Sequence, residues 1–311
     1  MLPSGLTARP ARRSDLNAWV AVAAEVERHS IGEVETDAAA VEGYWAETRF
    51  ELERDARVVV DESGSVVGHS SVWEALPGVV WVLTYVVPRL APTVEPALLG
   101  DGLDRAREIA AASPDTAWLV QVPNYVADAT RGGWIAAHGL TVVRHFYRMA
   151  IDFDHDAPPA VEALPGVVVR RVDPVTELSV VHRIMEEAFV GHWNSKPTSY
   201  DEFAARFVHS RYDPRLWFLA ELDGVPVGAL IGRANPDGRG WVRELGVLSH
   251  ARGRGIGGAL LSRAFREFHA LGWPGAGLGV DADNATGATR LYARAGMRPV
   301  VSVEWWQGPV T

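Results

Sequence analysis

The stretch from Arg252 to Leu261 reads RGRGIGGALL, and its glycines lead directly into an apolar run that is typical of a helix. Glycine has no Cβ atom, so a glycine-rich loop lets the backbone approach a ligand closely. The first turn of the following helix presents unpaired N–H groups and the positive end of the helix dipole. The stretch therefore predicts a loop that holds an anionic group at the start of a helix.

Three other interpretations of this loop compete with that one. Residues 253–258 also satisfy the G-x-G-x-x-G pattern of dinucleotide-binding folds, and Asp281 follows about twenty residues later. That fold places the pattern directly after its first strand, whereas here an antiparallel meander is expected before it. A Walker-type loop needs a lysine after its glycines, but the only lysine of the chain is Lys196. A plain turn before a core helix does not need three alternating glycines.

The chain carries an internal repeat with an offset of roughly 160 residues. GSVVGHSSV (64–72) resembles GVPVGALIG (224–232), and ATRGGWIAAHGLTVV (129–143) resembles ATRLYARAGMRPVV (288–301). Between the copies, DFDHDAPPAVEALPG (152–166) is acidic and rich in proline, which is typical of a linker. We therefore expect an N-terminal domain at 1–155, a linker at 156–166 and a C-terminal domain at 167–311.

Each copy shows the same order of expected elements. In the second copy, a short strand and helical segments precede a meander with turn signals at DG and NPDG, and the glycine loop with its helix follows. A strand, a short helix capped by Gly296 and a last strand complete the copy. This order predicts an α/β (α+β) fold in which each domain is a mixed, mostly antiparallel twisted sheet flanked by helices.

Two signatures in the second copy resemble those of a known family. LGVLSHARGRGIGGALL (245–261) resembles the acetyl-CoA loop of the GNAT acetyltransferases, in which a strand ending in L-x-V precedes R/Q-x-x-G-x-G/A at a helix start. NATGATRLYARAGM (284–297) resembles the second signature of that family. The resemblance covers about 167–306 well and, through the repeat, about 6–152 faintly. It implies two tandem GNAT-like domains, a degenerate N-terminal one and a catalytic C-terminal one.

The resemblance also implies how the C-terminal domain binds its acetyl donor, acetyl-CoA. The L-x-V triplet, the loop and Asn284 are expected to hold the coenzyme, although Asn284 is equally suited to cap a helix. Tyr292 matches the tyrosine that protonates the departing thiolate; its alternative role is packing of its helix onto the sheet. The expected cofactor-binding residues are Leu245, Gly246, Val247, Arg252, Gly253, Arg254, Gly255, Ile256, Gly257, Gly258 and Asn284.

The proton acceptor for the amine is expected at Glu244, which directly precedes the triplet. Other members of the family carry their catalytic glutamate three positions earlier, where this chain has Trp241. Strand alternation puts these two positions on opposite faces unless a bulge intervenes, and a water relay is the alternative base. For the acceptor, we expect His192 and Trp193, in the segment after the first long helix of the second copy, to line a pocket; the alternative is a purely structural role, such as that of a buried aromatic side chain.

Composition excludes several other classes of function. The chain has 311 residues, no cysteine and a formal net charge of −9. It therefore lacks thiolate metal sites, disulfides and the basic footprint of a nucleic-acid binder. No metal motif is present, and no apolar run approaches the ~20 residues of a membrane helix. We expect no metal, no nucleic-acid or membrane partner and a cytoplasmic location; the sequence carries no signal for an oligomeric state.

These observations predict acetyl-CoA-dependent N-acetylation of a primary amine on a small-molecule acceptor, at a single active site in the C-terminal domain. The alternative is a non-catalytic acyl-CoA-binding sensor or scaffold. In the first copy the glycines are replaced by VVPRLAPTVEPALLG (86–100), in which Pro92 and Pro96 cannot donate hydrogen bonds and Glu95 repels phosphate. Ile135 stands where the second copy has its tyrosine.

One acetyl-CoA per chain is therefore expected, although the fold is duplicated. Calorimetric titration of the full chain should saturate near one equivalent, because only the second copy retains a phosphate-binding loop. A Gly255→Glu chain should bind none, since a carboxylate in that loop repels the pyrophosphate. A second tight site would mean that the first copy binds the coenzyme by another route.

Overall fold

The computed structural model describes residues 2–34, 36–47, 49–153, 158, 163–207, 213–284 and 287–310. Contacts between residues divide the chain into two compact units. Unit 1 consists of Met1–His145 and Ser302–Thr311, and unit 2 consists of Phe146–Val301. Most of the linker expected at 156–166, together with the acidic Asp154–Asp156, lies outside the described residues.

Unit 1 is built on a mixed sheet with the strand order β1-β2-β3-β4-β5-β12. Neighbouring strands run antiparallel, except that β4 and β5 run parallel. In β4 every second residue is buried, as expected for a valine-rich strand whose side chains alternate between two faces. The strands are β1 (Thr7–Pro10), β2 (Ala56–Val60), β3 (Val66–Leu76), β4 (Val79–Val86), β5 (Leu119–Tyr125) and β12 (Arg298–Pro309).

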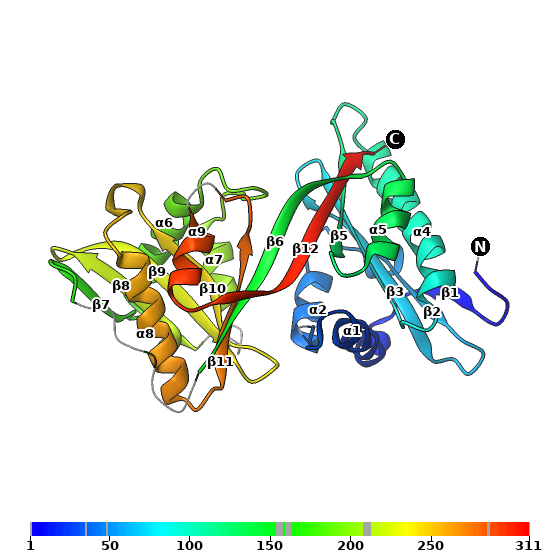
Figure 1. Ribbon diagram of the computed structural model, residues 1–311. Helices are drawn as coiled ribbons and strands as arrows, with labels where there is room; N and C mark the ends of the chain where they lie inside the picture. The colour runs from blue at the N-terminus through cyan, green and yellow to red at the C-terminus, as the bar shows by residue number, and fades with distance from the viewer. Residues whose placement is uncertain are drawn as a thin grey trace. The chain divides into compact units, whose positions relative to one another are not determined.

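Helices cover both faces of this sheet. On one face, the Trp19 ring of α1 stacks on His69 of β3, with 3.8 Å between the ring centroids. On the other face, Gly102 of α4 lies directly against the side chain of Val82, and Figure 1 shows α4 beside α5. The helices are α1 (Leu16–Ile31), α2 (Ala38–Trp45), α3 (Leu52–Asp55), α4 (Ala91–Ala111) and α5 (Ala129–Ala137), with a 3-10 turn η1 (Arg13–Asp15).

Unit 2 repeats this plan with the strand order β6-β11-β10-β9-β8-β7. Again one internal pair, β10 and β11, runs parallel, and the other neighbours run antiparallel. The predicted fold, a mixed and mostly antiparallel sheet flanked by helices in each copy, is thus confirmed. The strands are β6 (Thr141–Asp152), β7 (Val167–Arg171), β8 (Trp217–Leu222), β9 (Val225–Ala234), β10 (Gly240–Val247) and β11 (Gly275–Asp281).

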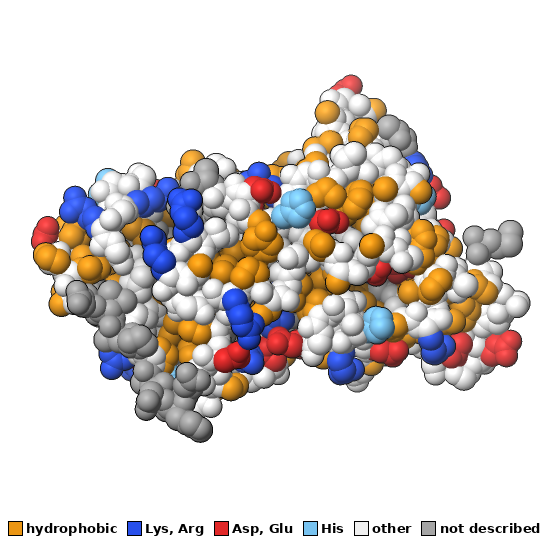
Figure 2. Space-filling model, in the orientation of Figure 1, with side chains coloured by type: hydrophobic (Ala, Val, Ile, Leu, Met, Phe, Trp, Pro, Cys, Tyr) orange, Lys and Arg blue, Asp and Glu red, His pale blue; other side chains and the backbone are white. Residues whose placement is uncertain are grey.

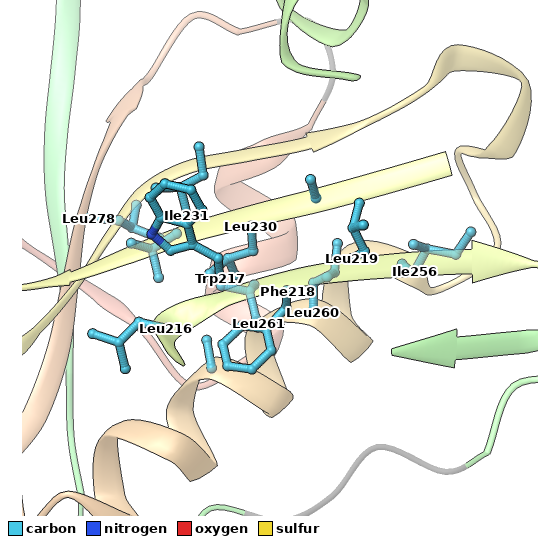
Figure 3. Packing of buried hydrophobic residues seen from close by; sticks show 14 of the residues in the cluster. Leu216, Trp217, Phe218, Leu219, Leu230, Ile231, Ile256, Leu260, Leu261 and Leu278 are labelled. Atoms are coloured by element: carbon cyan, nitrogen blue, oxygen red, sulfur yellow. The ribbon is translucent and has the colours of Figure 1, made fainter. Parts of the chain in front are cut away.

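The core of unit 2 fixes the helix that follows the glycine loop. Ile256, Leu260 and Leu261 of α8 are buried against β8 and β9 (Figure 3). Burial of one such side chain stabilises the fold by roughly 1.5–3 kcal/mol. Because Ile256 is the first residue of α8, the core holds the loop end of this helix in place. The helices are α6 (Leu178–Phe189), α7 (Tyr200–Phe207), α8 (Ile256–Ala270) and α9 (Ala288–Arg294), with 3-10 turns η2 (Pro214–Leu216) and η3 (Ser249–Ala251).

The last strand of each copy completes the sheet of the other copy. Residues 146–152 of β6 pair with β11 of unit 2, and residues 303–309 of β12 pair with β5 of unit 1. The repeat predicts domains at the continuous stretches 1–155 and 167–311, and that division of the sequence stays a prediction. The compact units of the folded chain have different bounds. Each unit contains a segment that the sequence order assigns to the other copy.

A chain that ends at Val301 should therefore destabilise unit 1 selectively. It loses the strand that pairs with β5, the contact of Trp305 with Trp81 at 4.8 Å between ring centroids, and the hydrogen bond from Gln121 to Gln307. Hydrogen–deuterium exchange read by mass spectrometry should show β5 amides exchanging roughly tenfold faster or more, while β8 and β9 keep their protection. Unchanged protection in β5 would contradict the observed pairing.

Candidate functional site

A cavity of about 560 Å³ opens in unit 2 where two parallel strands part. β10 and β11 pair only between Gly240–Val242 and Ala276–Leu278. Beyond these residues the two strands, both fully described, diverge. Residues 243–247 of β10 and residues 279–281 of β11 line the cavity on its two sides.

The glycine loop forms one wall of this cavity at the N-terminus of α8. Gly253 and Gly255 have φ values of 77° and 80°, which glycine adopts without a steric penalty. Gly255 is the N-cap of α8 and provides no side-chain cap, so the N–H groups of the first turn remain for a bound anion. Gly257 and Gly258 keep that turn free of side chains on the cavity wall. The antiparallel β8-β9-β10 meander before the loop rules out the dinucleotide-fold interpretation.

The two arginines predicted to bind the coenzyme have different surroundings. Arg252 lines the cavity, but its guanidinium donates to the backbone oxygens of Val247 (3.0 Å) and Ala188 (3.1 Å). It thus ties the end of β10 to α6. Arg254 is exposed and does not line the cavity. Figure 2 shows further basic side chains on the part of unit 2 where Figure 1 places α6 and α9, and Arg294 of α9 lines the cavity.

A β-bulge in β10 decides which way Glu244 faces. The pairing of β10 with β9 shifts register between Val242 and Glu244. Before the bulge, Gly240 lies against Phe268 of α8; after it, Gly246 lies against Ala188 of α6. The bulge therefore inverts the alternation, and Glu244 shares the α6 face with Gly246.

Trp241, the other position considered for the catalytic glutamate, precedes the bulge and lies on the same α6 face. The ring of Trp241 lies over Gly277 of β11, with Arg148 and Arg233 stacked near it. Trp241 and Glu244 thus lie on the same face of the sheet, whereas regular strand alternation would place them on opposite faces. Leu245 points the opposite way, toward Gly257 of α8.

Tyr292 and Asn284 both line the cavity. Tyr292 is 8% exposed, and burial raises the pKa of its phenol to about 12. It therefore carries its proton throughout the neutral range. Asn284 is not the N-cap of α9, because the helix begins at Ala288 with Gly287 as its cap. This removes the helix-capping role that the sequence alone left open for Asn284.

His192 and Trp193 lie in the cavity wall, in the loop after α6. Trp193 contacts Phe146 of β6, with 5.7 Å between ring centroids. Burial, and next the charge of Arg252, lower the pKa of His192, while Asp281 acts in the opposite direction. The imidazole is therefore uncharged at neutral pH, and it lies close enough to Asp281 to feel its charge.

The structure adds cavity residues that the sequence interpretation did not select. Phe146 and Asp281 are paired across β6 and β11, and Gly279 lies two positions before Asp281 on the same face. In the sequence, Asp281 stands out only as part of a dinucleotide pattern, and Phe146 lies in the first copy. The main additions to the predicted set are Phe146, Phe189, Arg243, Gly279, Asp281, Leu291 and Arg294.

Unit 1 contains the same parting of strands, but a buried ion pair bridges it. Glu95 of α4 is 3% exposed; it accepts hydrogen bonds from Thr84 of β4 and from Arg131 of α5. Arg131 also donates to the Pro123 carbonyl oxygen and to Asn124 of β5. The sequence predicts that Glu95 repels phosphate at this place; the structure adds that its carboxylate is bound by Arg131 and Thr84 inside the unit. A cavity of about 160 Å³ remains beside this pair.

Two features are absent from the described residues. Among the helices that the structure describes, none is both long enough and apolar enough to cross a membrane. Over the same residues, no three acidic or histidine side chains are grouped as a metal ion requires.

Comparison with known proteins agrees with this geometry. Residues 178–297 match the model of the acetyltransferase (GNAT) family. The chain is 32% identical over 185 residues to a mycothiol acetyltransferase of Cellulomonas flavigena, covering 56% of this chain and 53% of the relative. It is 30% identical over 221 residues to a mycothiol acetyltransferase of Streptomyces avermitilis, covering 67% of this chain and 68% of the relative. The chain spans about half the length of the first of these relatives.

A solved structure resembles the whole chain. A GCN5-related N-acetyltransferase from Sphaerobacter thermophilus covers 100% of this chain, and the chain covers 97% of it, with a TM-score of 0.84 and 27% sequence identity. The tandem arrangement predicted from the repeat, like that of mycothiol synthase, is confirmed. The parted strands, the glycine loop and these likenesses together show that the chain belongs to the GNAT acetyltransferase family.

Proposed function

We propose that this chain transfers the acetyl group of acetyl-CoA to a primary amine on a small molecule, at one site in unit 2. The observation that carries the proposal is the parting of β10 and β11. The opening between these strands forms one cavity. The proposed phosphate-binding start of α8 lines it on one face of the sheet, and the carboxylate of Glu244 lines it on the α6 face. The curated relatives named mycothiol acetyltransferase support acetyl transfer as the reaction.

The α8 face suits the coenzyme. The loop glycines and the first turn of α8 would hold the pyrophosphate through backbone N–H groups. A Cβ atom on Gly257 would lie 2.9 Å from the end of the Leu291 side chain, so a larger residue there would require Leu291 to shift. The edge of β10 beyond Val242 has lost β11 as a partner, which leaves Leu245–Val247 to contact the acetyl-bearing arm. Oriented backbone donors at a polarised carbonyl contribute a few kcal/mol, typically ~3.

The α6 face suits the amine. Glu244 projects from this face into the cavity and is the proposed acceptor of the proton that the amine loses on attack. Asp281 adds a second carboxylate near the same opening, which favours entry of a cationic ammonium group. A water molecule between Glu244 and the amine would serve the same purpose.

Tyr292 is the proposed proton donor to the coenzyme A thiolate. The phenol is protonated because burial raises its pKa to about 12. A developing thiolate, with an ordinary thiol pKa near 8.5, is a weaker base than phenolate, so donation requires close contact as the C–S bond breaks. Tyr292 lies on α9, on the same side of the sheet as the loop.

The alternative function is a sensor that binds acyl-CoA without turnover. An assay for free coenzyme A distinguishes the two functions, because only an acetyltransferase releases it. A panel of primary amines should include at least one that produces free thiol from acetyl-CoA. Tyr292→Phe should then lower kcat by roughly ten- to a thousand-fold and leave the Kd for acetyl-CoA nearly unchanged. Tyr200→Phe, at an exposed position that does not line the cavity, is the matched control and should keep wild-type kcat.

Because the phenol loses its proton only near pH 12, wild-type kcat should show no fall from this ionisation at lower pH. A chain that binds acetyl-CoA but acetylates no amine would favour the sensor. A Tyr292→Phe variant as fast as wild type would leave Tyr292 with a packing role only.

The phosphate-binding role of the loop is best tested at Gly258. Gly255 has a φ of 80°, and a Cβ atom there would lie 3.2 Å from Leu164, so Gly255→Glu would also strain the loop. Gly258 lies in the first helical turn, where a Cβ atom meets only Leu291 at 3.9 Å. Gly258→Glu should weaken acetyl-CoA binding by roughly 100-fold or more, because it places a carboxylate at the helix start.

Gly133→Glu provides the control for that variant. Gly133 is an exposed glycine of α5 in unit 1 where an added Cβ atom would meet nothing within 4 Å, and it is not among the residues that line the unit 2 cavity. The Gly133→Glu chain should bind acetyl-CoA as tightly as wild type in calorimetry. Equal affinity in the Gly258→Glu chain would remove the loop from the proposed coenzyme site.

A further inference from the structure

β11 carries a row of three alternate glycines on the α6 face, at positions 275, 277 and 279. Packing explains the first two. A Cβ atom on Gly275 would collide with the Ile151 carbonyl oxygen, and one on Gly277 would lie 2.9 Å from the ring of Trp241. Both glycines are buried.

Packing does not explain the third. A Cβ atom on Gly279 would have no heavy atom within 4 Å, and the residue is exposed although its two strand neighbours are buried. Its φ is outside the left-handed region, so no turn requires glycine there. Arg148, its partner on β6, pairs with Asp237 at 3.1 Å and lies over Trp241, so its guanidinium is held on the side of Trp241.

An unneeded glycine in a strand lowers stability relative to alanine. Such a position commonly marks a close approach of a ligand to the backbone. Gly279 is also the first residue of β11 beyond its last pairing with β10, so it forms the floor of the cavity at the point where the strands part.

The surroundings of Gly279 indicate which ligand would use that space. Glu244, the proposed base, projects from the same face of the sheet, and Asp281 follows Gly279 on it. Phe146 and Trp193 form an aromatic wall beside them. A flat floor next to an aromatic wall accommodates a ring, with its amine directed toward the carboxylates.

We propose that Gly279 sets the width of the acceptor site and selects amines attached directly to a ring over amines on an unbranched chain. This inference rests on the proposed acetyl transfer and specifies the acceptor side of the same site. The ring packs on the bare backbone of Gly279 and against Trp193, and any side chain at position 279 occupies that space. The selectivity therefore acts on the acceptor, whereas the coenzyme lies on the α8 face.

Two amino alcohols that differ only by a ring test the proposal: 2-aminocyclohexanol and ethanolamine. Wild type should favour 2-aminocyclohexanol in kcat/KM, measured by release of free coenzyme A from acetyl-CoA. In Gly279→Val, the ratio of the two kcat/KM values should fall roughly tenfold or more, with the change mainly in KM for the ring compound. Gly279→Ala should give an intermediate ratio.

Stability and a matched control keep the test specific. Valine suits a strand and meets open space at position 279, so the Tm of Gly279→Val should equal or exceed that of wild type. Gly308→Ala, at a strand glycine of unit 1 whose Cβ atom would make an ordinary 3.5 Å contact with Leu140, should keep the wild-type ratio.

The outcomes separate the two proposals. An active wild type whose Gly279→Val variant keeps the same ratio overturns the inference about Gly279 and leaves acetyl transfer standing. A wild type that favours ethanolamine also overturns it. If wild type binds acetyl-CoA but acetylates no amine at all, the proposed function fails, and the inference fails with it.

Discussion

The site depends on one constraint, which is that β10 and β11 stay paired for three residues and then part. A parallel pair that continued would satisfy its backbone groups within the sheet and leave no opening. Because β10 and β11 part after Val242 and Leu278, one edge of each strand has no partner strand there, and the opening connects the two faces of the sheet. The bulge at the same point turns Glu244 toward the α6 face while Leu245 faces α8. One irregularity thus separates the proposed coenzyme side from the proposed acceptor side.

In unit 1 of the same fold, side chains of the unit itself bridge the corresponding opening. Its strands β4 and β5 also part after three residue pairs, yet Glu95 and Arg131 bridge them together with Thr84. Glu95 aligns with Gly257 in the repeat, so a glycine that leaves room for a ligand corresponds to a carboxylate that is bound internally. Removing one partner from such a buried pair typically costs about 3–5 kcal/mol. Loss of either partner would therefore leave an uncompensated charge buried in unit 1.

In unit 2, burial serves both the fold and the proposed chemistry. The apolar residues at the start of α8 fix the helix end that faces the cavity. Burial raises the pKa of Tyr292, and burial together with the charge of Arg252 lowers the pKa of His192, so both side chains are uncharged near neutral pH. Arg252 uses its guanidinium to join β10 to α6, which holds the cavity wall in place. Charge at this site is thus arranged mainly through the helix start and the carboxylates of the opposite face.

Sequence patterns predicted those features of the protein that depend on residues close together in the chain. The glycines at 253–258, the helix start behind them and the spacing to Asn284 and Tyr292 are local patterns, and the structure brings them to one cavity. The repeat likewise predicted two similar sheets. Four features became visible only in the folded chain: the bulge beside Glu244, the internal pairing of Glu95 with Arg131, the bare backbone at Gly279 and the exchange of last strands. Each of these features depends on contacts between residues that are distant in the sequence. For the exchange of last strands, the two similar copies offer equivalent strands to either sheet, so only strand pairing in the folded chain determines which sheet each strand joins.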